Sequence, residues 1–225
     1  MIYQQTDSGV LYCGDCLEIL PTLEVKADLA LTDPPYGIKM SKGFGGFRGF
    51  GGFGKPIASK QYDDDWDNQR PSKSVFDAIL LCAVKSIIFG GNYFADILPQ
   101  ANHWAVWHKH NTMPTFSDCE LLWTNIKRNS VKLFDYEYNG LLGKEKERFH
   151  PTQKPVNLIG MILNEYSKEQ DLILDPFAGS GTTAIACIRY NRRYILIEKE
   201  EKYCEIAAKR IESELEQADI FRSEQ

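Results

Sequence analysis

Short apolar runs alternate along the chain with longer segments whose apolar residues recur at helical spacing. The apolar runs predict strands at residues 10–13, 27–32, 86–89, 103–107, 172–174 and 193–197, and a terminal hairpin made of residues 120–124 and 131–134. The helical spacing predicts helices at residues 16–20, 75–84, 155–166, 182–190 and 200–215. Asp15 and Ser72 can cap the first two helices. This alternation favours an α/β fold with a doubly wound, mainly parallel sheet.

Length and composition predict one domain of that kind. The chain has 225 residues, of which 43% are hydrophobic, and this is enough for one well-buried domain over residues 1–225. The formal net charge is −5, so contact with nucleic acid would depend on a local basic surface. We see no apolar run long enough for a bilayer and no signal-peptide pattern, which predicts a cytoplasmic protein without membrane contact.

The six cysteines do not form a recognisable framework. Cys13 and Cys16 have metal or redox spacing, but no second cysteine or histidine pair stands at zinc-finger distance from them. Free thiols in a reducing compartment explain the pattern better, and we predict no metal site.

The segment Thr-Asp-Pro-Pro-Tyr-Gly directly follows the apolar run 27–32. The carboxylate of Asp33 and the carbonyl of Pro34 can each accept a hydrogen from a planar amino group, and two prolines hold these acceptors in place. Tyr36 offers an aromatic face for stacking on a base. The competing interpretation is an ordinary Pro-Pro turn at the end of a strand.

A second segment, Asp-Pro-Phe-Ala-Gly-Ser-Gly-Thr-Thr at 175–183, follows another apolar run. Its glycines permit close approach of a nucleotide-like cofactor, and no lysine follows the last glycine, which excludes a phosphate-binding Walker motif. We expect Ser180 and Thr182 to cap the next helix. Glu198 ends the following apolar run, where an acidic residue binds ribose hydroxyls, although it could instead cap a helix.

In this order the two segments resemble the motifs of the beta class of DNA amino-methyltransferases, and the resemblance covers nearly the whole chain. It implies a class I methyltransferase: a Rossmann-like, seven-stranded sheet with a terminal antiparallel hairpin, in which the strands before the two motifs are neighbours. It also implies methyl transfer from S-adenosylmethionine to adenine N6 in DNA after base flipping. The catalytic residues would be Asp33, Pro34, Pro35 and Tyr36.

Other activities remain as alternatives to this interpretation. A cytosine N4 methyltransferase is one, although serine is commoner than aspartate at the first motif position in such enzymes. Protein-glutamine and ribosomal-RNA methyltransferases commonly carry asparagine there, and this chain does not. A non-catalytic relative that binds cofactor or DNA is the last alternative.

The resemblance also implies a set of cofactor contacts. Asp15 would accept from the cofactor's adenine, although helix capping competes for it, and Lys154 would pair with the methionine carboxylate unless Thr152 or backbone N–H groups do so. The complete set of predicted cofactor-binding residues is Asp15, Thr152, Lys154, Asp175, Phe177, Gly179, Gly181, Thr182 and Glu198.

Two further segments are candidates for DNA contact. The loop 41–60 places phenylalanine in a glycine background and lies in a stretch whose charged residues are all positive, which suits stacking and phosphate contact, unless it is a tolerated insertion. The resemblance places target recognition in a small insert at 125–150, whose mixed charges also suit a solvated face. Besides DNA, the resemblance leaves open a homodimer and a companion restriction endonuclease.

Overall fold

The computed structural model describes residues 1–38, 69–110, 117–137 and 153–223. The loop 41–60, Thr152 and the part of the insert 125–150 after residue 137 lie outside these ranges, so the predictions made for them stay predictions.

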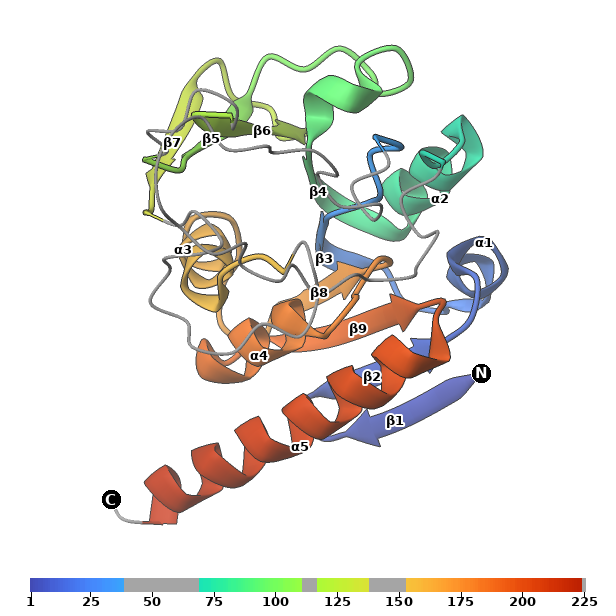
Figure 1. Ribbon diagram of the computed structural model, residues 1–225, viewed down its shortest axis with the longest axis vertical. Helices are drawn as coiled ribbons and strands as arrows, with labels where there is room; N and C mark the ends of the chain where they lie inside the picture. Colours follow the sequence, from blue (N-terminus) through green and yellow to red (C-terminus); the bar gives the residue numbers. More distant parts are fainter. Residues whose placement is uncertain (39–68, 111–116, 138–152, 224–225) are drawn as a thin grey trace, which may run out of the picture.

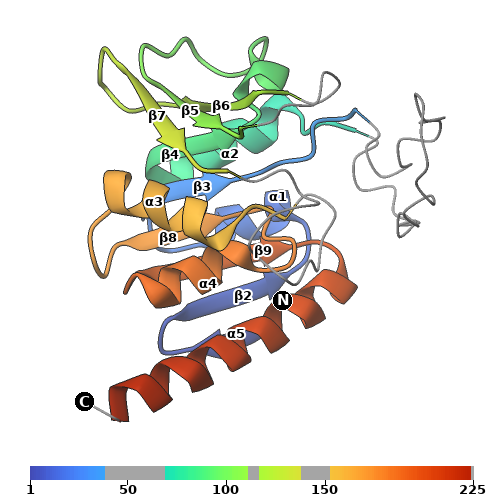
Figure 2. The same cartoon turned by 60° about the vertical axis from the view of Figure 1, so that its left-hand side comes forward.

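The described strands form one sheet with the order β1-β2-β9-β8-β3-β4-β6-β5-β7 (Figures 1 and 2). The strands are β1 (Ile2–Thr6), β2 (Gly9–Cys13), β3 (Ala27–Thr32), β4 (Ala83–Phe89), β5 (Trp104–His108), β6 (Cys119–Thr124), β7 (Val131–Asp135), β8 (Leu172–Asp175) and β9 (Arg193–Glu198). The helices are α1 (Cys16–Ile19), η1 (Leu20–Thr22), α2 (Lys73–Cys82), η3 (Gly91–Phe94), α3 (Val156–Tyr166), α4 (Thr182–Arg189) and α5 (Glu201–Ser223).

The sheet is mixed, with nine described strands rather than the predicted seven. β2, β9, β8, β3 and β4 are parallel, whereas β1 pairs antiparallel with β2 and β6 pairs antiparallel with β4 and β5. The strand β1 was missed because its Ile-Tyr-Gln-Gln-Thr sequence is polar and lies at an exposed edge.

The predicted terminal hairpin is wrong. β5 lies between β6 and β7, pairs antiparallel with β6 and parallel with β7, and so keeps the two predicted hairpin partners apart. A hairpin is the default for two consecutive antiparallel strands, but β5 satisfies the hydrogen bonds of both neighbours instead. As a result, β5 and β7 point in the same direction as β3, and their carboxyl ends lie at the same edge of the sheet.

The helices cover both faces of the sheet. The helices α3, α4 and α5 bury one face, with Leu29, Leu31 and Ile87 in that core. The helices α1 and α2 bury the other face, where Ala30 and Ile88 alternate with the first set. This alternation follows from the two-residue period of a strand buried on both sides. No helix among the described ranges is long and apolar enough to cross a membrane.

The strand β8 pairs in parallel with β3, as the resemblance implied. From this pair the chain continues outward in opposite directions, because β3 leads to β4 on one side and β8 leads to β9 on the other. The loops after β3 and β8 therefore separate and leave a crevice beyond the carboxyl ends, where α/β proteins bind their ligands.

Candidate active site

A pocket lies in this crevice and joins the two motifs. Its wall is formed by Thr32 at the end of β3, Asp33 directly after it, the loop after β8 and the end of β9. Of the predicted site residues, the pocket is lined by Asp33, Pro35, Lys154, Asp175, Phe177, Gly179, Thr182 and Glu198. The sheet thus brings together residues separated by more than half of the sequence.

Asp175 organises the glycine loop from within. It is 4% exposed, and its Oδ1 accepts from Thr32 Oγ1 at 2.8 Å and from the Phe177 N–H at 3.1 Å. Its Oδ2 accepts from Thr183 Oγ1 at 2.6 Å. Burial raises the pKa of Asp175 to about 6 despite these hydrogen bonds. Through these hydrogen bonds the carboxylate links the ends of β3 and β8 to the first turn of α4.

The two glycines of the loop have different surroundings. Both have positive φ, 52° at Gly179 and 79° at Gly181, a region that disfavours other residues. Gly179 lines the pocket and donates its N–H to Glu198 Oε2 at 2.7 Å. At Gly181 a Cβ atom would lie 2.9 Å from the Cβ of Ala207 in α5. Gly181 is therefore required for helix packing at this position, and its predicted contact with the cofactor remains a prediction.

The cap of α4 also differs from the prediction. Gly181 occupies the N-cap position and no side chain caps the helix. Ser180 Oγ instead contacts Gln153 and Arg210, at 3.3 Å and 3.0 Å, and Arg210 also reaches Thr182 Oγ1 at 3.4 Å. Capping by Asp15 is confirmed, because its Oδ1 accepts from the Leu17 N–H at 2.9 Å.

Asp15 does not line the pocket. Its second oxygen pairs with Lys199 at 3.1 Å, and the Leu17 hydrogen bond lowers the pKa of its carboxyl group. Its predicted contact with the cofactor's adenine remains a prediction. Neighbouring Cys16 is a buried thiol whose pKa burial raises to about 11, and all six cysteines are free.

Glu198 is the last residue of β9 and is 9% exposed. Its Oε2 accepts from Gly179, and its Oε1 accepts from the Glu200 N–H at 2.8 Å, just before α5 begins. Of the two carboxylate oxygens, Oε1 therefore makes the contact expected of a helix cap. Burial raises the pKa of this carboxyl group. Because each carboxylate oxygen has two lone pairs, Glu198 can still accept from ligand hydroxyls in the pocket.

The predicted catalytic turn belongs to a buried network of charged groups. Asp33 Oδ2 accepts from Lys154 Nζ at 2.5 Å, and Lys154 also pairs with Glu120 at 3.1 Å. Lys109 pairs with the other oxygen of Glu120 at 2.7 Å. Burial alone would lower the pKa of Lys154, but Asp33 and Glu120 raise it. Lys154 thus pairs with the turn, and its predicted contact with a methionine carboxylate remains a prediction.

The hydroxyl group of Tyr36 lies between two carboxyl groups. The Tyr36 hydroxyl oxygen lies 2.6 Å from Asp33 Oδ1 and 2.6 Å from Glu120 Oε1, but it has only one hydrogen to donate. Burial raises the pKa of Asp33, whereas Lys154 and Lys109 outweigh burial at Glu120 and lower its pKa to about 2. Of the two carboxyl groups, Asp33 therefore has the higher pKa and Glu120 the lower one.

The Tyr36 ring is already stacked. It lies parallel to the ring of Tyr93, with centroids 4.7 Å apart and planes 15° apart. It also passes so close to Gly90 that a Cβ there would lie 2.3 Å from Tyr36 Cε1, so only glycine fits at that position. One face of Tyr36 is therefore occupied, and its stacking on a base remains a prediction for the other face.

Sequence reasoning missed Glu120 and Lys109. The signal was present, because Glu120 is the one charged residue in the otherwise apolar run Glu-Leu-Leu-Trp, and its side chain is 10% exposed. A carboxylate is rarely buried without a partner, so its position in a buried strand predicts an internal cation. The identity of that cation depends on strand order and could not be predicted.

The structure has an α/β sheet with a pocket at the carboxyl ends of its parallel strands, and its similarity to solved methyltransferases identifies the class I methyltransferase fold. In the solved structures, the chain matches an M1.HpyAVI complex with S-adenosylmethionine (TM-score 0.58, 21% identity, 89% of this chain and 98% of that one). It also matches the cytosine-N4-specific PvuII DNA methyltransferase (TM-score 0.59, 15% identity, 95% of this chain and 93% of that one).

The family is established from the sequence. The family model described as DNA methylase matches residues 92–209, more than half of the chain, and the chain belongs to this S-adenosylmethionine-dependent family. The type II methyltransferase M.HinfI of Haemophilus influenzae is 27% identical over 251 aligned positions, covering 88% of this chain and 67% of that protein. The type II methyltransferase M2.DpnII of Streptococcus pneumoniae is 48% identical over 91 residues, which are 39% of this chain and 34% of that protein.

Proposed function

We propose that this chain transfers a methyl group from S-adenosylmethionine to the N6 amino group of adenine in DNA. The observation that carries the proposal is one pocket lined by both Asp33 of the Pro-Pro turn and Glu198 of the cofactor side. Aspartate at the first position of the turn supports adenine over cytosine, for which the resemblance would favour serine.

The pocket suits a cationic nucleoside. Carboxylates in its lining outnumber ammonium groups: Asp33, Asp175, Glu198 and Glu200 stand against Lys154 and Lys199. Glu198 can accept from sugar hydroxyls, and apolar side chains including Phe177 provide a surface for the nucleoside. When bound, the cofactor supplies a methyl group on a positively charged sulfur.

The turn would prepare the amino group of the substrate. This amine is a poor nucleophile because its lone pair is delocalised into the base. In the proposed mechanism the carboxyl group of Asp33 and the carbonyl of Pro34 each accept one amino hydrogen, which favours a pyramidal nitrogen. The buried pair with Lys154 holds Asp33 in place, at an Nζ to Oδ2 distance of 2.5 Å. The target base must leave the duplex to reach this position.

The test compares Asp33→Ala with the wild-type chain on unmodified genomic DNA. Loss of one hydrogen-bond acceptor should raise the barrier by about 3 kcal/mol, a rate loss of roughly two orders of magnitude. Binding of S-adenosylmethionine, measured by calorimetry, should persist. The fold should also persist because Lys154 keeps its pair with Glu120.

Asp77→Ala is the matched control, since it removes an exposed carboxylate that pairs with Lys73 on α2. It should leave both measurements unchanged. Mass spectrometry of the nucleosides identifies the product: N6-methyladenine supports the proposal, and N4-methylcytosine replaces it with the cytosine alternative. A wild-type chain that binds the cofactor but methylates no DNA supports the non-catalytic alternative, and normal turnover by Asp33→Ala would refute the mechanism.

A further inference from the structure

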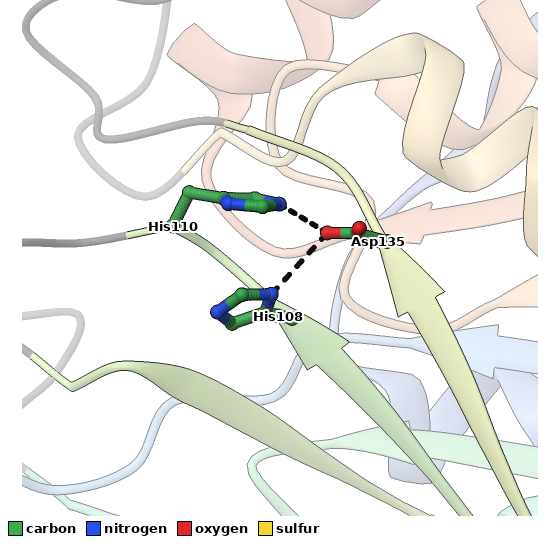
Figure 3. Close-up of side chains that lie close together, drawn as sticks. All are labelled: His108, His110 and Asp135. Atoms are coloured by element: carbon green, nitrogen blue, oxygen red, sulfur yellow. Dashed lines mark hydrogen bonds and ion pairs between the residues drawn. The ribbon is translucent and has the colours of Figure 1, made fainter.

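A second group of ligating side chains lies outside the pocket, at the ends of β5 and β7 (Figure 3). His108 and Asp135 are the last residues of these two strands and stand opposite each other in the parallel register. Paired residues in neighbouring strands share a face of the sheet, and His110, two residues beyond His108, comes back to that face. None of the three lines the pocket.

The three side chains converge on one point. His108 Nδ1 lies 3.2 Å from Asp135 Oδ1, and His110 Nε2 contacts the same oxygen. The three ligand atoms all lie within 4.8 Å of one another. In a tetrahedral zinc site with metal–ligand distances near 2.0–2.2 Å, ligand atoms are separated by roughly 3.3–3.6 Å, so small side-chain rotations would suffice. The rings of His108 and His110 are also neighbours, with centroids 4.1 Å apart.

The fold does not need this cluster for its core. All three side chains are at least two-fifths exposed, at 42%, 43% and 59% for His108, His110 and Asp135. By contrast, Trp107 and Lys109 point to the opposite face, where Lys109 reaches Glu120 of the active-site network. The alternation along β5 therefore separates a buried catalytic side from an exposed side that carries metal-binding groups.

We propose that His108, His110 and Asp135 form a binding site for a divalent transition-metal ion of the zinc class. Two imidazoles and one carboxylate suit zinc, cobalt or nickel, whereas magnesium and calcium prefer oxygen ligands throughout. Three protein ligands leave coordination positions for water. The ion joins the carboxyl ends of β5 and β7, next to the residue from which Lys109 extends to Glu120. The sequence analysis predicted no metal site from cysteine spacing and did not consider these three residues.

The experiment uses the full chain without an affinity tag, under a reductant that does not bind metal. Zinc binding is measured by calorimetry, and cobalt binding by its visible absorption, which is stronger for four- or five-coordinate cobalt than for the hydrated ion. We expect one ion per chain at this site, with an affinity that falls more than about tenfold in His108→Ala and in His110→Ala. Zinc should also raise the unfolding temperature of the wild type more than that of either variant.

Asp135→Asn and Glu137→Gln form a matched pair, because both remove one exposed carboxylate near the end of β7. Binding should weaken in Asp135→Asn and persist in Glu137→Gln. Equal weakening in both would show only diffuse attraction to negative charge and would overturn the proposal. Absence of zinc and cobalt binding to the wild-type chain would also overturn the proposal. The cluster would then consist only of two hydrogen bonds to one carboxylate. Binding unchanged in both histidine variants would place the ion elsewhere and overturn it as well.

Discussion

Asp175→Asn should stabilise the protein at neutral pH. The wild-type carboxyl group is buried, and its pKa is raised from 3.8 to about 6. At 1.36 kcal/mol per pH unit, ionising this group in the folded protein costs about 3 kcal/mol more than in the unfolded chain. Asparagine removes that charge and can keep the hydrogen bonds: its oxygen can accept from Thr32 and Phe177, and its amide can donate to Thr183 Oγ1.

The pH dependence of the free energy of unfolding determines whether Asp175→Asn stabilises or destabilises the protein. Because the folded pKa is higher than the unfolded pKa, the folded state of the wild type holds this proton more tightly. The contribution of Asp175 is therefore most favourable below pH 3.8 and is lost as the pH rises through about 6. The asparagine variant lacks this titration, so its advantage should grow with pH and reach its limit near neutrality.

The assay is urea unfolding of both proteins across this range. The difference in the free energy of unfolding should increase by about 2 kcal/mol between roughly pH 4.5 and 7.5. Asp7→Asn is the control, since Asp7 is an exposed carboxylate in the turn between β1 and β2 and its removal changes the net charge equally. A difference between Asp175→Asn and wild type that does not change with pH would refute the reasoning.

Two further predictions concern the glycine loop after β8 and the end of β9. Gly181→Ala should lower the free energy of unfolding by about 1–3 kcal/mol, because the φ angle of this residue is 79° and the added Cβ would meet Ala207. Chemical denaturation measures this free energy, and an unchanged stability would contradict the packing role. Glu198→Gln should weaken S-adenosylmethionine binding by about 1–3 kcal/mol through the loss of charged hydrogen bonds. Calorimetry checks the second prediction, with Glu201→Gln at the start of α5 as its control, and equal affinity in wild type and Glu198→Gln would exclude Glu198 from the cofactor site.

The local features of this chain were predictable because they depend on neighbouring residues. Apolar runs located most strands, and the Asp15 cap of α1 follows from a side chain two residues from its partner N–H. The two motifs were recognisable for the same reason, since each is a continuous segment at the end of a strand. The polar edge strand β1 was missed because its residues carry no apolar run.

Residue environments beyond the local segment required the tertiary structure. The sequence does not show that Gly181 packs against Ala207 of a later helix, a contact that comes in addition to its predicted role at the cofactor. Lys154 appeared suited to a ligand carboxylate, and in the structure it pairs with Asp33, which directly follows β3, and with Glu120 of β6. Such pairs depend on which strands are adjacent, and the composition of buried strands does not specify their neighbours.

The sequence by itself determined the α/β class, the two motifs and the family resemblance, because these depend on periodicity and contiguous segments. Only the tertiary structure decided the strand order, which places β5 between β6 and β7 and sets β8 beside β3, so that Thr32 and Asp175 hydrogen bond across 143 positions of sequence. It also decided the contacts of the Tyr36 hydroxyl group with Asp33 and Glu120, and the meeting of His108, His110 and Asp135. The physical reason is that parallel strands buried on both faces are uniformly apolar, so their pairing and register are set by how the helices pack around them.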